Sequence, residues 1–441
     1  MDLEGYAKRA LIRGDEEILP GLVDRILEIK DISKERAERI ANAVITEADA
    51  TLGLESNFLT FPRSGVSMGD FGVGSRGEGD FYAHEKIAEV IGRTGAVLDS
   101  SQQDDAGAVR LNDDSYLVVT VDGMHSRLSD FPFLAGFHVA RATLRDVYVM
   151  GAIPVALFSD IHVADDGDVA KIFDHIAGIS VVSEIMNVPF ITGSTLRIGG
   201  DMVIGERMTG CVGAVGTAKN LTPRRDAKPG DVILMTEGAG GGTISTTALY
   251  YGRPDIVQET LNVKFLHVCD LLVKEGLSEE IHAMTDVTNG GIRGDAQEIS
   301  KTAQVRLVFR EDKLRSLVNL NVMAMLDELD IDYLGVSIDT LLVISTEEVA
   351  EKIKSLLSKE SILVEEVGYV EEGTGSMILV DGEIRDLSLR FRESAYTPLK
   401  KLIDESPEED FEEMRRRIDE VVHESIRKKH ELIQHLHDTD K

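Results

Sequence analysis

Four acidic positions stand out because each follows an apolar stretch or adjoins a glycine turn. Asp105 belongs to QQDDAGAVRL, Asp122 follows the apolar run LVVTV, and Asp146 lies in LRDVYVMGA. Asp286 lies in MTDVTNGGIRG, where a short extended piece leads to a glycine pair and a helix. Mg²⁺ bound to a nucleotide commonly uses a few carboxylates plus phosphate oxygens. One such Asp alone is usually a turn or cap residue, but these contexts make the four candidate metal ligands.

The first glycine-rich loop, FPRSGVSMGDFGVGSRGEGD, contains the sequence G-x-G-x-x-G from Gly72 to Gly77. No predicted strand precedes it, so a dinucleotide-binding turn is not supported there. Its backbone amides could still wrap phosphates, with Arg76 adding positive charge. A loop that is merely flexible is an equally good interpretation.

A second glycine run, Gly238 to Gly242, follows the predicted strand DVILMTE and precedes a predicted helix. This order suits a nicotinamide cofactor, although Thr243 replaces the third glycine and no second strand ends in an acid about 20 residues later. Close packing of strand and helix is the favoured interpretation, and an oxidoreductase is a remote alternative. No G-x-x-x-x-G-K-[ST] occurs, which excludes a P-loop.

Histidine and cysteine give weaker indications. His125 follows Asp122 by three residues and could touch a substrate, whereas His162 and His175 suit surface or packing positions. The only cysteines are Cys211 and Cys269, far apart and without metal-ligand spacing. This argues against a disulfide framework and a structural zinc site, and predicts two buried thiols.

Composition excludes several classes of partner. The 441 residues contain 47 Lys and Arg against 78 Asp and Glu, a net charge of −31. Such a surface argues against nucleic-acid grooves and anionic lipid. No apolar run approaches the ~20 residues of a membrane span, and MDLEGYAKRA lacks a signal-peptide core. We therefore expect a cytoplasmic protein with no nucleic-acid or membrane partner.

The elements that must position these residues suggest four regions. A helical extension is expected at 1–58, an α/β unit at 59–218, a second α/β or α+β unit at 228–388, and an amphipathic helix at 400–441. The segment 219–230, with two prolines and a basic cluster, is predicted as the boundary between the two units.

Both units alternate strands and helices. Strands are predicted at 116–121, 155–158, 189–192, 208–215, 231–236, 341–344, 364–370 and 376–380. Helices are predicted at 81–93, 137–150, 168–186, 243–251, 263–274 and 290–302.

Each end of the chain has helical signals of its own. Ser33 can cap a helix with apolar residues at helical spacing, and Ser406-Pro407-Glu408-Glu409 has the form of a second cap. The stripe that follows this second cap is Phe411, Met414, Ile418, Val422, Ile426, Ile433 and Leu436. We expect the N-terminal extension to pack on the main body, and the tail helix to dock on its own domain or on a dimer mate. A partner or regulatory contact is the alternative for either end.

Taken in order, these segments resemble the PurM-like superfamily of aminoimidazole ribonucleotide synthetase. The superfamily includes thiamine-monophosphate kinase, selenophosphate synthetase and a hydrogenase maturation carboxamide dehydratase. DDAGAV resembles its DDAAV motif, TVDGMH its strand-end T-D, and RDVYVMGAIP its N-D-x-x-x-M-G-A-x-P motif. PGDVILMTEGAGG resembles the opening of its second domain, and MTDVTNGGIRG resembles D-x-T-x-G-G. The match covers roughly 65–385.

The resemblance implies an N-terminal α/β domain that forms a dimeric barrel, a C-terminal α+β domain, and helical extensions at both ends. It implies Mg²⁺-ATP between the domains, a homodimer, and phosphoryl transfer to an unidentified acceptor, either a small metabolite or a maturation target. By the same resemblance the metal ligands would be Asp105, Asp122, Asp146 and Asp286. Of these, Asp105, Asp122 and Asp286 would be catalytic. The nucleotide contacts would be Gly74, Ser75, Arg76, Gly77, Thr120, Arg145, Gly193 and Thr195.

Departures from the family pattern keep a second function open. Ser194 replaces the acid of G-G-D-T, and Arg145 stands where Asn is usual. The reactive loop cysteine and the C-terminal cysteine of two branches are both missing. A nucleotide-binding regulator or assembly factor without catalysis is therefore the alternative to an enzyme.

Overall fold

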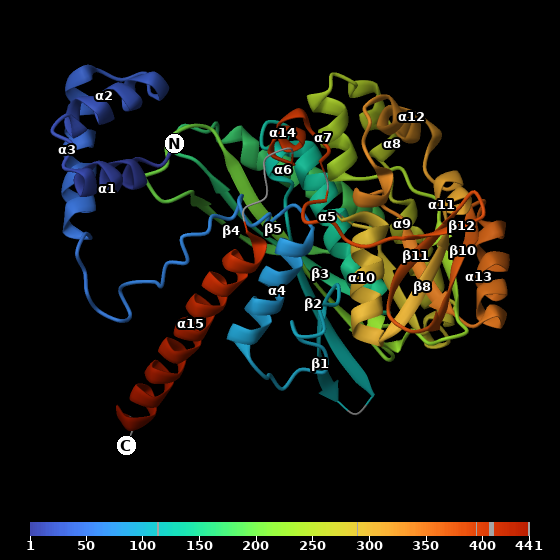
Figure 1. The fold of residues 1–441 in the computed structure, drawn as a ribbon. Coiled ribbons are helices and arrows are strands. Elements are labelled where there is room, and N and C mark those ends of the chain that lie inside the picture. Colours follow the sequence, from blue (N-terminus) through green and yellow to red (C-terminus); the bar gives the residue numbers. More distant parts are fainter. Residues whose placement is uncertain (113, 289, 394, 405–409, 440–441) are drawn as a thin grey trace.

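The computed structural model describes residues 1–112, 114–288, 290–393, 395–404 and 410–439. Two β-sheets with their helices form the body of the molecule (Figure 1). The first sheet belongs to the N-terminal half of the chain and the second to the C-terminal half. This mixed α/β architecture is the one that the sequence predicts.

The first sheet has five strands in the order β1-β2-β5-β3-β4. The strands are β1 (Gly107–Asn112), β2 (Ser115–Gly123), β3 (Ile153–Val163), β4 (Phe190–Arg197) and β5 (Met208–Ala218). Its neighbours are antiparallel except β3 and β4, which pair in parallel. The parallel pair is joined through helix α6 (Ala170–Met186), because parallel strands need a crossover connection.

Helix α5 (Pro132–Val149) packs on the first sheet and beside α6. It begins five residues before the predicted start, since a proline suits the first turn of a helix. Its apolar side chains, among them Leu144 and Val147, are fully buried. Arg141 and Arg145 are also buried and line a cavity between the two halves. The helix therefore joins the first core to the site.

The second sheet has seven strands in the order β12-β11-β8-β10-β6-β9-β7. The strands are β6 (Val232–Thr236), β7 (Ala283–Asp286), β8 (Val305–Arg310), β9 (Leu341–Ser345), β10 (Val364–Glu372), β11 (Gly375–Val380) and β12 (Glu383–Asp386). Strand β6 is antiparallel to both neighbours, β9 and β10. The glycine run after β6 therefore does not open a parallel βαβ unit, which the oxidoreductase alternative requires.

Helices of the second half surround this sheet and its core. They are α7 (Gly242–Tyr250), α8 (Val257–Thr260), α9 (Lys264–Lys274), α10 (Gly291–Ala303), α11 (Glu311–Ser316), α12 (Leu320–Glu328) and α13 (Glu347–Lys359). Helix α9 packs against α5, so its buried face shares a core with the first half. The cysteine on this helix, Cys269, is buried as predicted, whereas Cys211 on β5 is half-buried.

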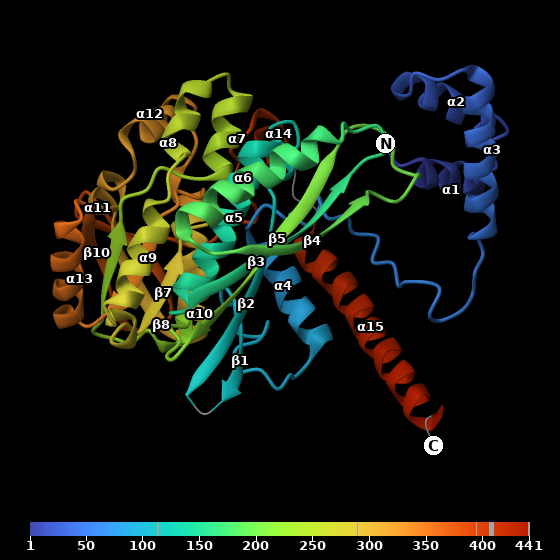
Figure 2. The same cartoon turned by 180° about the vertical axis from the view of Figure 1, so that it is seen from behind.

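The N-terminal extension is a three-helix unit beside the end of β4 and β5 (Figures 1 and 2). Its helices are α1 (Leu3–Arg13), α2 (Ile18–Ile29) and α3 (Lys34–Ala50). Ser33 caps α3 by accepting a hydrogen bond from the backbone N–H of Arg36, as predicted. The unit has its own apolar core and joins the body through Lys30, whose Nζ lies 2.7 Å from Asp166 Oδ1.

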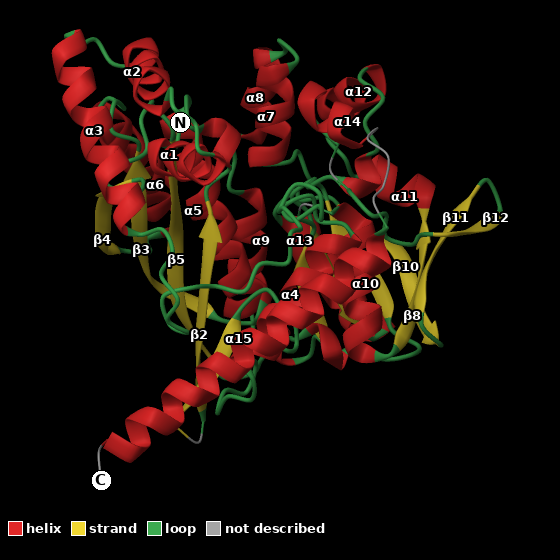
Figure 3. Cartoon of the chain, turned by 60° about the vertical axis from the view of Figure 1, so that its left-hand side comes forward, coloured by secondary structure: helices red, strands yellow, loops and turns green. Residues whose placement is uncertain are grey.

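The chain ends in α14 (Pro398–Asp404) and the long α15 (Phe411–Thr439). Helix α15 packs on α4 (Glu78–Ile91) as far as Lys429, whose Nζ donates to the carbonyl oxygen of Val90, and its C-terminal end projects from the body (Figure 3). Met414 and Val422 are buried, whereas Ile433 and Leu436 are exposed. The predicted docking on its own chain thus holds for part of the stripe. The predicted cap at 406–409 lies outside the described residues. Every described helix is too short or too polar to span a bilayer.

Candidate active site

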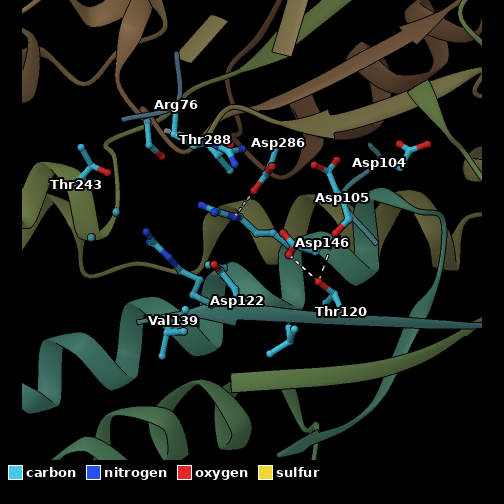
Figure 4. A pocket seen from close by; sticks show the side chains of 18 of the residues that line it. Arg76, Asp104, Asp105, Thr120, Asp122, Val139, Asp146, Thr243, Asp286 and Thr288 are labelled. Carbon is cyan, nitrogen blue, oxygen red and sulfur yellow. Dashed lines mark hydrogen bonds and ion pairs between the residues drawn. The ribbon is translucent and has the colours of Figure 1, made fainter. Parts of the chain in front are cut away.

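A cavity of about 500 Å³ lies where the two halves meet. Its walls come from β2 and α5 of the first half and from the ends of β7 and α7 of the second half. Figure 4 shows Asp105 and Thr243 on opposite sides of this cavity, with Asp122 and Asp146 between them. The cavity is therefore an interdomain site with an acidic region on one side.

All four predicted metal ligands line this cavity. Asp122 lies near the end of β2, Asp286 is the last residue of β7, and Asp146 projects from α5. Asp105 belongs to the turn before β1. The structure thus brings together four acids that are up to 181 positions apart in the sequence, as expected for residues at strand ends of one site.

Burial and mutual repulsion disfavour ionisation of these acids. Burial raises the pKa of Asp105 and of Asp286 to about 6. Burial, followed by the charges of Asp286 and Asp122, raises the pKa of Asp146 well above its ordinary value. The pKa of Asp122 is also raised, first by burial, although Arg145 opposes the shift. Such a cluster gains stability when positive charge enters the cavity.

Thr120 connects two parts of the acidic region. Its hydroxyl lies 3.0 Å from Asp146 Oδ2 and 3.3 Å from the carbonyl oxygen of Asp105 (Figure 4). Thr120 lies on β2 and lines the cavity, as predicted for a residue near a nucleotide. It orients the Asp146 carboxyl.

Arg224, which was not among the predicted site residues, neutralises part of the acidic region. Its Nη2 lies 2.6 Å from Asp105 Oδ1, and its Nη1 lies 3.1 Å from Glu298 Oε2. The side chain is buried, and its Nε and Nη2 also donate to Thr285 Oγ1. Arg224 belongs to the basic cluster between the domains, which sequence reasoning treated only as a boundary.

Arg145, where the family pattern has Asn, places a second guanidinium among the acids. Its Nε lies 2.8 Å from Asp286 Oδ2, and its Nη1 pairs with Asp339. Burial alone would lower the pKa of Arg145, but Asp286 and Asp339 raise it. Asp339 adopts a left-handed backbone with φ +58°, which costs energy for a non-glycine residue. The first and second domains are therefore joined by buried ion pairs inside the cavity.

The glycine loop contributes Arg76 to the cavity wall, whereas Gly74, Ser75 and Gly77 do not line it. A Cβ at Gly77 would lie 2.2 Å from the carbonyl oxygen of Phe391, so only glycine allows this close approach. The loop is thus packed against the C-terminal part of the second domain and presents one arginine to the site.

Gly193 and Thr195 are not brought to the cavity. Both lie in β4, where they are exposed and pair in parallel with Ser159 and Ile161 of β3. The predicted strand ended at Thr192, which placed these residues in a following loop. Their role as nucleotide contacts stays a prediction.

The side of the cavity near α7 holds residues that sequence reasoning mostly passed over. His138 and Arg141 of α5 are buried there, beside Gly241 and Gly242. His125, predicted to touch a substrate, also lines the cavity. Burial, then the charges of Lys400 and Arg127, lowers its pKa to about 4. The sequence signal that could have identified His138 and Arg141 is their polar type on a mostly apolar helix, two turns and one turn before Arg145.

Comparison with known protein families assigns both halves of the chain. The AIR synthase related protein N-terminal domain matches residues 103–218, and the C-terminal domain of the same family matches residues 228–381. The chain belongs to the AIR synthase-related family.

Relatives of this AIR synthase-related chain differ in sequence identity and in the share of the chain that aligns with them. It is 52% identical to an uncharacterized protein of Methanocaldococcus jannaschii, over all of this chain and 99% of that protein. It is 30% identical to the thiamine-monophosphate kinase of Pyrococcus horikoshii, over 48% of this chain and 66% of the kinase. It is 27% identical to the selenide, water dikinase of Myxococcus xanthus, over 52% of this chain and 64% of the dikinase. The latter two matches each span less than two thirds of the relative.

Solved structures support the AIR synthase-related fold. A HypE–HypF complex matches with a TM-score of 0.57 and 19% identity, over 70% of this chain and 99% of that chain. HypE in complex with ATP matches with a TM-score of 0.53 and 21% identity, over 64% of this chain and 88% of that chain. AaThiL complexed with AMPPCP and TMP matches with a TM-score of 0.52 and 18% identity, over 70% of this chain and 94% of that chain.

The acids of the AIR synthase-related cavity fit a cation bound together with phosphate. Among the described residues, no three His, Cys, Asp or Glu side chains form a ready metal cluster. Mg²⁺, however, usually takes only one or two carboxylates and completes its shell with phosphates and water. Oδ1 of Asp286 is buried without a hydrogen-bond partner in the described part of the chain, whereas Oδ2 lies 2.8 Å from Arg145 Nε. Such a carboxylate has capacity for a cation.

Proposed function

We propose that the chain is a cytoplasmic, ATP- and Mg²⁺-dependent enzyme that transfers the γ-phosphoryl group of ATP to an acceptor, either a small metabolite or a maturation target. The observation that carries the proposal is the convergence of Asp105, Asp122, Asp146 and Asp286, all with raised pKa values, on one interdomain cavity. The kinase relatives, and the ATP or AMPPCP bound in two structures of the same fold, support it.

In this proposal the four acids surround the site of Mg²⁺, each ion taking one or two of the carboxylates, and Arg76 contacts the phosphates. Mg²⁺ would supply positive charge to the phosphoryl group, which is the main requirement of a loose phosphoryl-transfer transition state. Thr120 keeps the Asp146 carboxyl oriented, and Arg145 keeps Asp286 in place. Gly74, Ser75 and Gly77 set the path of the loop that carries Arg76, and Arg145 provides fixed charge near the nucleotide.

We also propose a homodimer that forms through the open face of the first sheet. Exposed apolar side chains lie on neighbouring strands of this sheet: Val109, Leu111, Val119 and Val121. A row of exposed apolar residues on a sheet is typical of a face that another chain covers. In the dimer this face would be buried.

A nucleotide-binding regulator without catalysis is the second candidate. The observation that favours it is the pairing of Arg145 with Asp286, because this internal cation already occupies a carboxylate that a metal would use. The two functions differ in turnover, not in ATP binding.

Isothermal titration with ATP, with and without Mg²⁺, tests nucleotide binding. We expect binding that requires Mg²⁺ and weakens at least tenfold in Asp105→Asn, since a carboxylate close to the metal is lost. Asp49→Asn is the matched control, because Asp49 is an exposed acid on α3, far from the cavity residues. Absence of binding, or equal binding in the two variants, would contradict the proposal.

A further inference from the structure

The end of the cavity opposite Asp105 is built from α5 and the N-terminus of α7. His138 and Arg141 come from α5, and Gly241 is the residue before the first turn of α7. A Cβ at Gly241 would lie 4.0 Å from His138 Nδ1 and 2.8 Å from Arg141 Nη2. The imidazole nitrogen therefore faces the space above this glycine.

The hydrogen bonds behind His138 fix which nitrogen carries the proton. His138 Nε2 lies 2.8 Å from Ser245 Oγ, which lies 2.7 Å from Thr260 Oγ1. Thr260 in turn donates to the carbonyl oxygen of Val257 at 2.8 Å. Each hydroxyl has one hydrogen, so all three contacts are hydrogen bonds only if Nε2–H donates to Ser245 and Ser245 donates to Thr260. The neutral ring then has a lone pair, not a hydrogen, on Nδ1.

The Nδ1 lone pair has no partner among the described residues, although His138 is only 5% exposed. A buried acceptor without a donor costs free energy, which a bound ligand can recover. Burial, followed by the charges of Arg141, His125 and Arg145, lowers the pKa of His138 well below its ordinary value. The ring therefore stays neutral and keeps its lone pair.

Arg141 does not make this end of the cavity a binding site for phosphate. Its Nη1 donates to the carbonyl oxygens of Thr260 and Asn262 at 2.9 and 2.6 Å. Its Nη2 lies 2.8 Å from Asp339 Oδ2 and donates to the carbonyl oxygen of Gly240. The guanidinium charge is thus balanced and most of its donors are used.

We propose that this end of the cavity binds the acceptor, and that His138 Nδ1 accepts a hydrogen bond from a hydroxyl or amide N–H group of that acceptor. The positive end of the α7 dipole faces the same space and favours the lone pairs of the acceptor's oxygen. A fully ionised phosphate group has no hydrogen to give to Nδ1, so its oxygens would face a lone pair. His138 is therefore a specificity residue that selects an acceptor with a neutral donor group. This inference rests on the proposed phosphoryl transfer.

Nitrogen NMR of the full chain labelled with ¹⁵N-histidine tests the inference. His138 is assigned by the signal that disappears in His138→Gln, and it is expected as the Nε2–H tautomer with a bare Nδ1. Glycerol or acetamide, each added with and without Mg²⁺ and a non-hydrolysable ATP analogue, should shift the Nδ1 signal, whereas sulfate, a tetrahedral oxyanion without a hydrogen at neutral pH, should not. An Nδ1–H tautomer, an imidazolium, or a signal that shifts with sulfate and with neither glycerol nor acetamide would overturn it.

A matched pair of variants provides the second measurement, with water as the acceptor in ATP hydrolysis. Gln at 138 can still donate to Ser245 but has no acceptor at the Nδ1 position, whereas Asn at 138 keeps an acceptor atom there. We expect His138→Gln to reduce the hydrolysis rate about tenfold and His138→Asn to reduce it less, with ATP affinity unchanged in both. Equal losses would overturn the inference. Failure of the wild-type chain to bind ATP would overturn the proposed function instead, because the tautomer is read without nucleotide.

Discussion

The guanidinium of Arg145 lies against the carboxyl group of Asp286, with Nε 2.8 Å from Oδ2, and this ion pair connects α5 of the first domain to β7 of the second. Both side chains are buried. The pair therefore has two effects: it holds the domains together and it supplies fixed positive charge among acids that otherwise repel one another.

Replacement of Arg145 should show how much the stability of the folded chain depends on this ion pair. Arg145→Gln leaves Asp286 buried without its cation, whereas Asp339 keeps Arg141, and we expect the loss to cost about 3–5 kcal/mol of unfolding free energy. Mg²⁺ should raise the melting temperature of this variant more than that of the wild type. Arg385→Gln is the control, because Arg385 forms an exposed pair with Glu383 whose loss costs about 0–1 kcal/mol. Equal denaturation midpoints for the two variants would contradict the account.

The raised pKa of Asp105 predicts how stability changes with pH. In the folded chain this pKa is about 6, above its unfolded value, so between pH 4 and 6 the folded chain binds more protons than the unfolded chain. Stability from this group is complete at low pH and is lost as the pH rises through 6. Without Mg²⁺, the wild type should lose roughly 2 kcal/mol relative to Asp105→Asn between pH 4 and 7. Urea unfolding at several pH values measures the difference, and a change of the opposite sign would refute it.

The C-terminal helix should stabilise the glycine loop. Met414 of α15 is buried against Phe71 and Tyr82, and the Tyr82 hydroxyl donates to Asp419. Met414→Ala should cost about 2–5 kcal/mol of local packing and increase hydrogen exchange in the loop before α4. Leu436→Ala, at an exposed position of the same helix, should leave the exchange unchanged.

The open face of the first sheet predicts an effect on assembly. Val109 on β1 is 41% exposed and lies outside the residues that line the main cavity. Val109→Asp should convert a dimer into a monomer in light scattering, because a buried charge in an apolar interface has no partner. Ile384→Asp, an exposed apolar position on β12 of the other sheet, should remain dimeric. A wild-type chain that is monomeric in light scattering would contradict the proposed dimer.

The acidic region could be predicted because its signal is local. Asp122 lies near the end of the apolar strand β2, and Asp286 is the last residue of the apolar strand β7. Both strand ends face the same cavity. Thr120 was predicted only through the family resemblance, and the structure places it two residues before Asp122 on the same face of β2.

Arg76 and Arg145 were predicted and line the cavity, but Arg224 and His138 could not be predicted, because their partners are distant in the sequence. Arg224 lies 119 positions from Asp105, and His138 lies 107 positions from Ser245. Buried histidines and arginines on an apolar helix are compatible with many packings, so type and spacing alone do not reveal their role. Gly193 was misplaced for another reason: parallel pairing with β3 continues β4 beyond the predicted end at Thr192. Tertiary pairing here overrides local propensity.

Formation of ADP from ATP by the purified chain is the measurement that tests phosphoryl transfer most directly. The account predicts slow ADP formation that requires Mg²⁺, disappears in Asp122→Ala and persists in the surface variant Asp49→Asn, in a chain that binds ATP. ATP binding without any Mg²⁺-dependent ADP formation, or formation that survives Asp122→Ala, would contradict it.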